Sequence, residues 1–364
     1  MSKLNNKISD SAAEKVNKVD AESQIKHLSK IKPSRIAYPV IIGLLVVAYL
    51  IWREVDVEAL KQIQFTWRAL FWIFMALLCM VGRDFGYIYR IKVLSRGQLS
   101  WIESFRIIML WEFTSAITPS AIGGTSFAII YVHKEGVSLG RSSAIVLLTS
   151  FLDELYFVVM LPLLLFAIGK SKLFGVGDGM VESGIITVAF VGYFIKLAYT
   201  LLISYGLFIN PKGFKWLLFK LFHLPYLRKF KRSAIIVGND IAQSSKEIKG
   251  QGLKFWFEVI SSTFLSWSSR YFVVNALILG FFVFSDHFLL FARQLVMWIM
   301  MLIMPTPGGS GFAEYFFKEY LNDFIPVAGL GIILALIWRL VTYYPYLVIG
   351  AIIFPRWVKD KFRG

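Results

Sequence analysis

The sequence predicts an all-α polytopic membrane protein, a helical bundle of about eight hydrophobic segments arranged as an inverted repeat. Three observations lead to this fold class. Of the 364 residues 57% are hydrophobic, and the mean hydropathy is +0.64, which is more apolar surface than a water-soluble domain can bury. The apolar residues fall into runs long enough to cross a bilayer. A short glycine-bearing signature occurs twice, once in each half of the chain.

The apolar runs predict eight helical segments along the chain. Their ranges are 36–52, 68–89, 101–117, 142–169, 184–208, 254–284, 288–304 and 326–354. Several runs exceed the about 20 residues that a spanning helix needs, so we expect them to tilt or kink. Six segments are expected to be full spans. The segments 101–117 and 288–304 are expected to belong to two re-entrant hairpins.

The segments define one membrane domain with a basic tail at each end. Residues 1–34 are polar and lack Phe, Trp and Tyr, which predicts a disordered basic cytoplasmic tail. The transmembrane domain is expected to cover 35–355, with repeat one at 35–170 and repeat two at 184–355. Residues 356–364 form a second basic cytoplasmic tail.

Basic residues set the expected orientation. Lysine and arginine number 39 against 23 acidic residues, for a net charge of +16. The excess lies in the two tails and in the loop 209–252, and by the positive-inside rule all three are cytoplasmic. The loop also mixes aromatic residues with its lysines and arginines, as basic amphipathic segments in the headgroup layer do. We therefore expect a multi-pass protein of the plasma (inner) membrane with cytoplasmic N- and C-termini, membrane lipids as partners, and no nucleic acid.

The glycine-bearing signature predicts the two hairpins. Gly-Gly-(Thr/Ser)-x-Phe-Ala is found at 123–128 and again at 308–313, 185 positions later. Prolines precede both copies, so each predicts a break in a helix. The charge pattern requires 101–131 to enter and leave the membrane on the cytoplasmic side, and 288–322 to do so on the external side. Hairpins with one signature entering from opposite faces are what an inverted duplication produces.

These motifs resemble a known family. The stretch from Pro305 to Glu314, with the Pro-x-x-x-Gly-Gly at 119–124 and Gly136–Arg141 leading to Leu152-Asp153, is similar to the lysylphosphatidylglycerol synthase transmembrane region, a flippase-like integral membrane family. The resemblance covers about 35–355. It implies movement of a polar lipid between leaflets, or a related role with polyprenyl-linked intermediates. It does not imply lipid aminoacylation, which belongs to a separate soluble domain in two-part members. The partners expected from this resemblance include a synthase that supplies the lipid.

The two signatures supply the first set of candidate binding residues. Prolines remove backbone donors and glycines permit close approach, so a helix that restarts after the break directs free N–H groups and its positive dipole end into the membrane. A phosphate or carboxylate suits such a place. The alternative is that Gly-Gly only permits tight helix packing. The candidates are Pro119, Gly123, Gly124, Thr125, Pro305, Pro307, Gly308, Gly309, Ser310 and Gly311.

Charged residues inside the predicted spans supply the second set. Each costs about 2.5–3.5 kcal/mol to insert, so such residues usually face a cavity or a partner. Those noted here are Arg83, Asp84, Glu112, Asp153, Glu154, Lys196, Arg270, Arg293, Glu314 and Arg339. We expect Arg83, Arg270 and Arg339 to bind a lipid phosphate, and Asp153 and Glu154 to serve ion or proton coupling. Glu314 is expected either to contact the substrate or to cap the restarting helix.

Three of these charges also have alternative interpretations. Arg83 and its neighbour Asp84 can simply neutralise each other, and Lys196 can extend its ammonium to the interface. Arg83-Asp84-Phe85 nevertheless matches Arg270-Tyr271-Phe272 at a separation of 187 positions, close to the separation of the two signatures.

The leading function is a membrane transporter that translocates a polar or phosphate-bearing lipid: a phospholipid, an aminoacyl-phospholipid or a polyprenyl-linked intermediate. The alternatives are an intramembrane enzyme, with Asp153 and Glu154 as acid, base or metal ligand, and an accessory scaffold for lipid-linked substrates. The sequence holds no HExxH, GxSxG or Walker motif, and it has one cysteine, Cys79, and four histidines. We therefore expect no enzyme activity, no catalytic residue, no metal and no cofactor.

Overall fold

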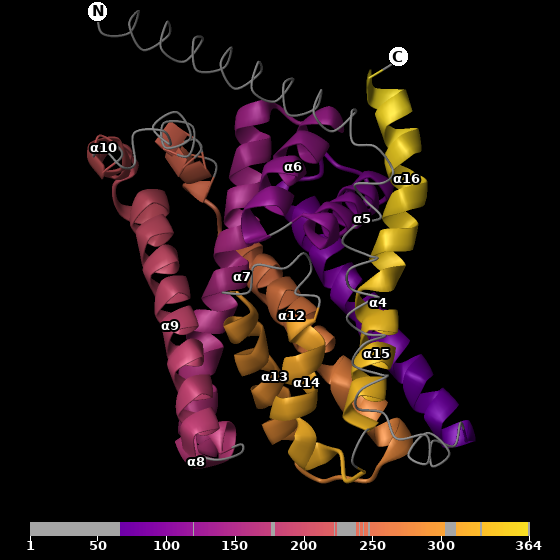
Figure 1. The fold of residues 1–364 in the computed structure, drawn as a ribbon. Coiled ribbons are helices and arrows are strands. Elements are labelled where there is room, and N and C mark those ends of the chain that lie inside the picture. Colours follow the sequence, from indigo (N-terminus) through magenta and orange to yellow (C-terminus); the bar gives the residue numbers. More distant parts are fainter. Residues whose placement is uncertain are drawn as a thin grey trace, which may run out of the picture.

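The computed structural model describes residues 66–118, 120–175, 179–221, 223, 238–239, 241–242, 244–246, 248–302, 311–327 and 330–362. The N-terminal tail, the first predicted segment at 36–52 and the signature residues Pro305–Ser310 lie outside the described residues. Within the described ranges the regular elements are all helical (Figure 1), which confirms the all-α prediction.

Long helices cross the whole molecule in Figure 1. They are α4 (Trp67–Leu94), α7 (Leu139–Ile168), α9 (Gly179–Ser204), α12 (Leu253–Phe281), and the pair α15 (Leu330–Thr342) and α16 (Tyr344–Phe362). α9 continues into one π turn, η1 (Tyr205–Ile209). Four stretches of the described chain are long and apolar enough to span a membrane: Trp67–Leu94, Leu139–Ile168, Glu182–Ile209 and Leu330–Lys361. They correspond to four of the six predicted spans and confirm a polytopic membrane protein.

α12 is the long helix that is not among these four. It has 29 residues, but it carries five serines between Ser261 and Ser269. Several of them face α4 rather than lipid. The Ser266 hydroxyl donates a hydrogen bond of 3.0 Å to the carbonyl of Arg83. A Cβ atom on Gly86 would lie 2.7 Å from the carbonyl oxygen of Ser262. The serines therefore belong to a close helix–helix seam of the kind that small residues form in membranes.

Replacing Gly86 with alanine is expected to separate α4 from α12. The added methyl group would collide with backbone as well as with the Ser266 side chain, and overpacking of this kind costs about 1–3 kcal/mol. The measurement is the free energy of unfolding, or the midpoint of thermal unfolding, of the purified protein in detergent. Gly184→Ala is the matched control, because a Cβ there meets nothing within 4 Å. Equal stability of the two variants would contradict the close seam.

Two hairpins of short helices lie between the long ones. The first is α5 (Trp101–Ile117) with α6 (Ser120–Lys134), and the second is α13 (His287–Met301) with α14 (Phe312–Tyr320). Each helix is shorter than the about 20 residues that span a bilayer. Figure 1 shows the first hairpin toward the end where α16 finishes and the second toward the opposite end, near α8 (Lys170–Phe174). Re-entrant hairpins require this placement; the inverted relation of the two halves and the repeat boundaries stay predictions.

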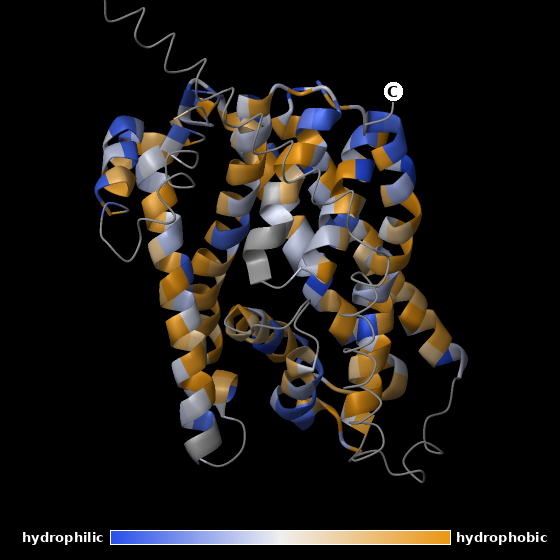
Figure 2. Cartoon of the chain, turned by 45° about the horizontal axis from the view of Figure 1, so that its top comes forward, coloured by the Kyte–Doolittle hydropathy of each residue, from blue (hydrophilic) through white to orange (hydrophobic). Residues whose placement is uncertain are grey.

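The predicted basic amphipathic stretch is described in part as α10 (Pro211–Leu221). Phe214 and Leu218 are buried, whereas Trp216 is exposed and lies 5.1 Å from the Lys220 ammonium. Figure 1 places α10 at the same end as the C-terminus, and Figure 2 shows hydrophilic residues gathered there. Two basic segments therefore lie at one end of the molecule, and the cytoplasmic location of that end stays a prediction.

Candidate functional site

The centre of the molecule holds a carboxylate between two arginines. Arg83 on α4 is fully buried, and it forms ion pairs with Asp84 at 2.6 Å and with Glu112 of α5. The other oxygen of Glu112 lies 3.8 Å from a guanidinium nitrogen of Arg270 on α12. The structure therefore brings together the two arginines that the sequence pairs at a separation of 187 positions, and Glu112 joins them.

Arg270 has the weakest anionic partner among the buried arginines of the described chain. Its guanidinium lies against the rings of Trp267 and Trp298, at 5.2 Å and 4.7 Å from their centres. Its Nε is buried without a hydrogen-bond partner, as are those of Arg83, Arg90 and Arg293, but among these four only for Arg270 is the carboxylate, at 3.8 Å, too far for a hydrogen bond. Arg83 pairs with Glu112 more closely than with Asp84, which is at 2.6 Å, and the carboxylate distances are 2.7 Å for Arg90 and Arg293 and 3.0 Å for Arg339. Arg270 is thus positioned by aromatic faces and has unused donor capacity.

The Arg83 pair is also tied to the C-terminal helix. Tyr346 of α16 donates its hydroxyl to both carboxylate oxygens of Asp84, at 2.8 Å and 2.9 Å. Arg83 stacks between Tyr87 and Tyr346, 4.6 Å and 5.0 Å from the ring centres. Asp84 is therefore satisfied by two partners, as the neutralising alternative expects, while Glu112 links the pair onward to Arg270.

A second pair lies where the hairpins meet. Glu314 of α14 is buried, and its carboxylate forms an ion pair of 3.0 Å with Arg339 and accepts a hydrogen bond of 2.7 Å from the N–H of Gly311. Gly311 has φ of +86°, which favours glycine. Glu314 therefore caps the start of α14, one of its two expected roles. The Arg339 guanidinium lies 3.8 Å above the Tyr343 ring, whose hydroxyl donates to the Ala116 carbonyl near the end of α5.

Asp153 and Glu154 are adjacent in sequence but have different partners. Asp153 accepts two hydrogen bonds from Arg90, at 2.7 Å and 3.1 Å, and a third from the Trp267 indole at 2.8 Å. Glu154 forms an ion pair of 2.7 Å with Lys196 of α9. Lys196 is buried, so it does not extend to the interface. The two carboxylates do not form a joint site, and their role in coupling stays a prediction.

The first signature has a different geometry from the one expected. α6 begins at Ser120 and runs through Gly123 and Gly124 without a break, whereas α5 ends at Ile117 with Thr118 as its C-cap. A Cβ atom on Gly124 would collide with Ser115 of α5. In this hairpin Gly124 therefore serves tight helix packing, the alternative reading of the motif. Thr125 is half-buried beside it. Pro119 and the second signature from Pro305 to Ser310 lie outside the described residues.

Several residues of this cluster were not predicted as site residues from the sequence. Glu112 and Lys196 were noted only as charges within predicted spans, while Arg90 resembled an ordinary helix-end arginine. No sequence pattern singled out Trp267 or Trp298, because tryptophan is frequent in this chain. Among the described residues no three His, Cys, Asp or Glu side chains gather as a metal site would require.

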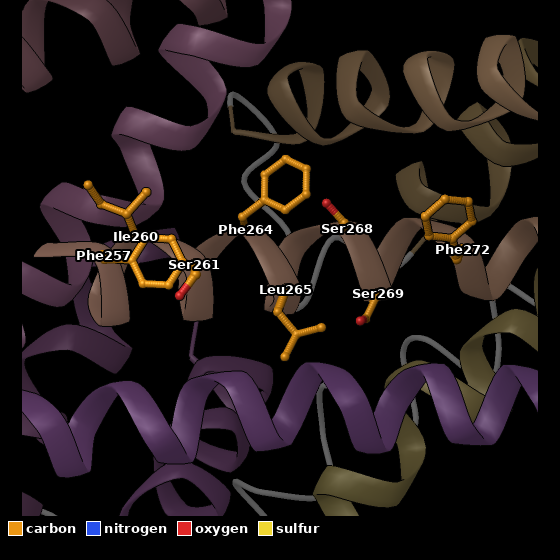
Figure 3. Close-up of a pocket in the computed structure, with 8 residues that line it drawn as sticks. All are labelled: Phe257, Ile260, Ser261, Phe264, Leu265, Ser268, Ser269 and Phe272. Carbon is orange, nitrogen blue, oxygen red and sulfur yellow. The ribbon is translucent and has the colours of Figure 1, made fainter. Parts of the chain in front are cut away.

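A groove on the outside of α12 is distinct from this cluster. Figure 3 shows its lining side chains along one face of the helix, and its volume is about 610 Å³. The lining is Phe257, Ile260, Ser261, Phe264, Leu265, Ser268, Ser269 and Phe272. Because none of these residues is charged, the groove lacks the chemistry that holds a polar headgroup, and we place the candidate site at Arg270 instead.

The fold and this cluster define an integral membrane protein with a charged site buried between two short hairpins. The model of the family described as the lysylphosphatidylglycerol synthase TM region matches residues 39–350, and the chain belongs to that family. A UPF0104 membrane protein of Archaeoglobus fulgidus is 28% identical over 298 residues, which cover 77% of this chain and 85% of the relative. No solved structure matches the chain. The family match confirms the resemblance found in the sequence.

Proposed function

We propose that the protein translocates a polar, phosphate-bearing lipid between the leaflets of its membrane, with Arg270 as a ligand of the headgroup. The observation that carries this proposal is the state of Arg270: a guanidinium that is held against two tryptophan rings and whose ion-pair partner Glu112 lies 3.8 Å away. A buried cation in a membrane protein is costly unless it serves a partner or a ligand.

The geometry supports exchange of a phosphate for Glu112 on Arg270. A lipid phosphate bound directly would form charge-assisted hydrogen bonds of about 2.7–2.9 Å, shorter than the present contact. Trp267 and Trp298 hold the guanidinium plane in place through cation–π contacts. Arg83 keeps Glu112 neutralised after it leaves Arg270, because the two form their own ion pair. Binding therefore leaves no charge without a partner.

The hairpins support alternating exposure of this site. Glu112 lies on α5 of the first hairpin, and Trp298 lies on α13 of the second. α12 begins 186 positions after α4, at Leu253 against Trp67, and α13 begins 186 positions after α5, at His287 against Trp101. Equal spacing supports a duplicated unit whose halves move against each other around a fixed site. The energy source is proposed to be the lipid gradient itself, or an ion or proton coupled through Glu154 and Asp153.

The enzyme alternative has less support. An acid or base needs a lone pair free to meet a substrate proton, whereas Asp153 accepts three hydrogen bonds from Arg90 and Trp267. A scaffold that presents lipid to a synthase partner would need the same headgroup site. Lipid transport by the isolated protein would distinguish a transporter from a scaffold.

Sidedness is a separate prediction of the same proposal. In a Cys79→Ser background, single cysteines at 133–136 are expected to react with a membrane-impermeant thiol reagent only from the cytoplasm, and those at 285–287 only from outside. The reason is that the three basic segments remain on the cytoplasmic side. The measurement is labelling in intact cells against inverted vesicles. The reverse pattern would contradict the proposed topology and the cytoplasmic placement of both termini.

The substrate class is tested by a leaflet-resolved assay in proteoliposomes. Labelled phosphatidylglycerol, its aminoacylated form and a polyprenyl phosphate are offered in parallel vesicles, and the label left in the outer leaflet is quenched over time. Faster redistribution of one lipid than in protein-free vesicles supports transport and names the class. No redistribution of any of the three, with folded protein in the vesicles, would overturn the proposal.

A further inference from the structure

The same ion pair closes the base of both hairpins. In the first hairpin Arg106 of α5 pairs at 2.9 Å with Glu135, which follows α6. In the second, Arg293 of α13 pairs at 2.7 Å with Asp323 in the short helix η4 (Asn322–Phe324) that follows α14. The two arginines are 187 positions apart and the two carboxylates 188. The pairs therefore occupy matching places in the two halves.

Each ion pair also contacts residues from the opposite half of the chain. Glu135 has only 1% of its side chain exposed. It accepts a hydrogen bond of 2.9 Å from the Trp357 indole and forms an ion pair of 2.9 Å with Lys361. Both partners lie near the end of α16, in the second half. We call these contacts of Glu135 with Arg106, Trp357 and Lys361 the Glu135 clasp.

The matching contacts of the second hairpin reach back to the first half. Arg293 donates to the carbonyl of Lys172 at 2.9 Å, and the Tyr320 hydroxyl donates to the carbonyl of Leu173 at 2.7 Å. Lys172 and Leu173 belong to α8, between α7 and α9. We call the contacts of Arg293 with Asp323 and Lys172, together with the Tyr320 bond, the Arg293 clasp.

The two clasps lie at opposite ends of the molecule. In Figure 1, α6 and the C-terminal part of α16 lie toward one end of the molecule, and α8 and α14 lie toward the other. The two ends of the molecule are also apart in the turned view of Figure 2.

The Glu135 clasp has the chemistry of a two-position contact. Separating α16 from α6 removes two of the three partners of a buried carboxylate at once, and a buried charge that loses its partners is strongly destabilised unless water enters. Packed interfaces of this kind switch between discrete arrangements rather than deforming continuously. The Glu135 carboxylate is thus either clasped and shielded or released and hydrated. In the Arg293 clasp the shielded partner is Arg293, at 3% side-chain exposure, while Asp323 is 52% exposed.

We propose that the Glu135 and Arg293 clasps are the two gates of the central site and that they open alternately, so that release at one end requires closure at the other. This inference rests on the proposed lipid translocation for its purpose, but its physical claim concerns the gates alone. The residues act by positioning the halves and need not touch the lipid.

Hydrogen–deuterium exchange of the full-length protein in nanodiscs tests the gates without any transport measurement. Glu135→Gln removes both ion pairs of its clasp. We expect amide exchange to rise about threefold or more in 131–137 and 355–361 and to fall in 318–325, because opening one end holds the other closed. Asp323→Asn is expected to give the opposite pattern. Asp360→Asn is the matched control, since it removes an exposed carboxylate beside Lys361 that has no contact with Glu135.

Faster exchange at both ends in either variant, or no change at the far end, would overturn alternate gating. If Glu135→Gln fails to fold, Lys361→Gln takes its place, because it removes a partner of Glu135 whose own side chain is 29% exposed. The same reciprocal pattern of exchange is expected. Reciprocal exchange in a protein that moves no lipid would support the gates and contradict the proposed function, so the two failures are distinguishable.

Discussion

Replacing Arg270 with alanine is expected to lower the rate of lipid translocation at least about tenfold, since a hydrogen bond to a charged group contributes about 1.5–3 kcal/mol and about 1.4 kcal/mol corresponds to a factor of ten. The protein should remain folded, because Arg270 has no carboxylate within hydrogen-bond distance and its loss leaves Glu112 paired with Arg83. The measurement is the initial rate of headgroup redistribution in proteoliposomes at matched protein content.

Two further variants sharpen this prediction. Arg270→Lys keeps the charge but loses the planar fork and its stacking on the tryptophans, so an intermediate rate is expected. Arg356→Ala removes an arginine from an exposed position of α16 and should leave the rate unchanged. If Arg270→Ala moves lipid as fast as the natural protein, the headgroup site lies elsewhere.

Replacing Asp153 with alanine is expected to destabilise the protein by about 3–5 kcal/mol, because it leaves the buried Arg90 guanidinium without its carboxylate. Arg90 is 1% exposed and holds Asp153 through two hydrogen bonds, and Trp267 would lose its acceptor as well. The measurement is the midpoint of thermal unfolding in detergent, with yield of monodisperse protein as a second observable.

The control is the double replacement Arg90→Met with Asp153→Leu. Exchanging a whole buried ion pair for apolar side chains is often neutral or stabilising, so the double variant should recover much of the lost stability. A single Asp153→Ala variant as stable as the natural protein would show that the pair is not structural. It would return Asp153 to the candidates for coupling.

The helical bundle was predictable because its signals are local. The apolar run at 101–117 coincides with α5 at both ends, and 142–169 lies within a few residues of α7 at its start and one at its end. Bilayer thickness and hydropathy decide such boundaries without knowledge of the partners of each helix. α12 shows the limit of this rule, since its serines serve the seam with α4.

The pairing of charges was only partly predictable. The matching positions of Arg83 and Arg270 indicated a common site, because a repeat transmits position as well as composition. Asp153 finds its partner 63 positions away in Arg90, and no local pattern specifies which helices cross there. Gly124 likewise occurs in a motif typical of helix breaks, and only the closeness of α5 reveals its packing role. Side-chain partners depend on helix crossings that hydropathy does not encode.

The most direct test of lipid translocation is the redistribution of a labelled phospholipid in vesicles that carry the natural protein, compared with protein-free vesicles and with vesicles carrying Arg270→Ala. Lipid movement well above the protein-free rate, reduced at least about tenfold in the variant, is the predicted result. Equal rates in all three preparations, with folded protein confirmed in the vesicles, would contradict both the transport function and the role of Arg270.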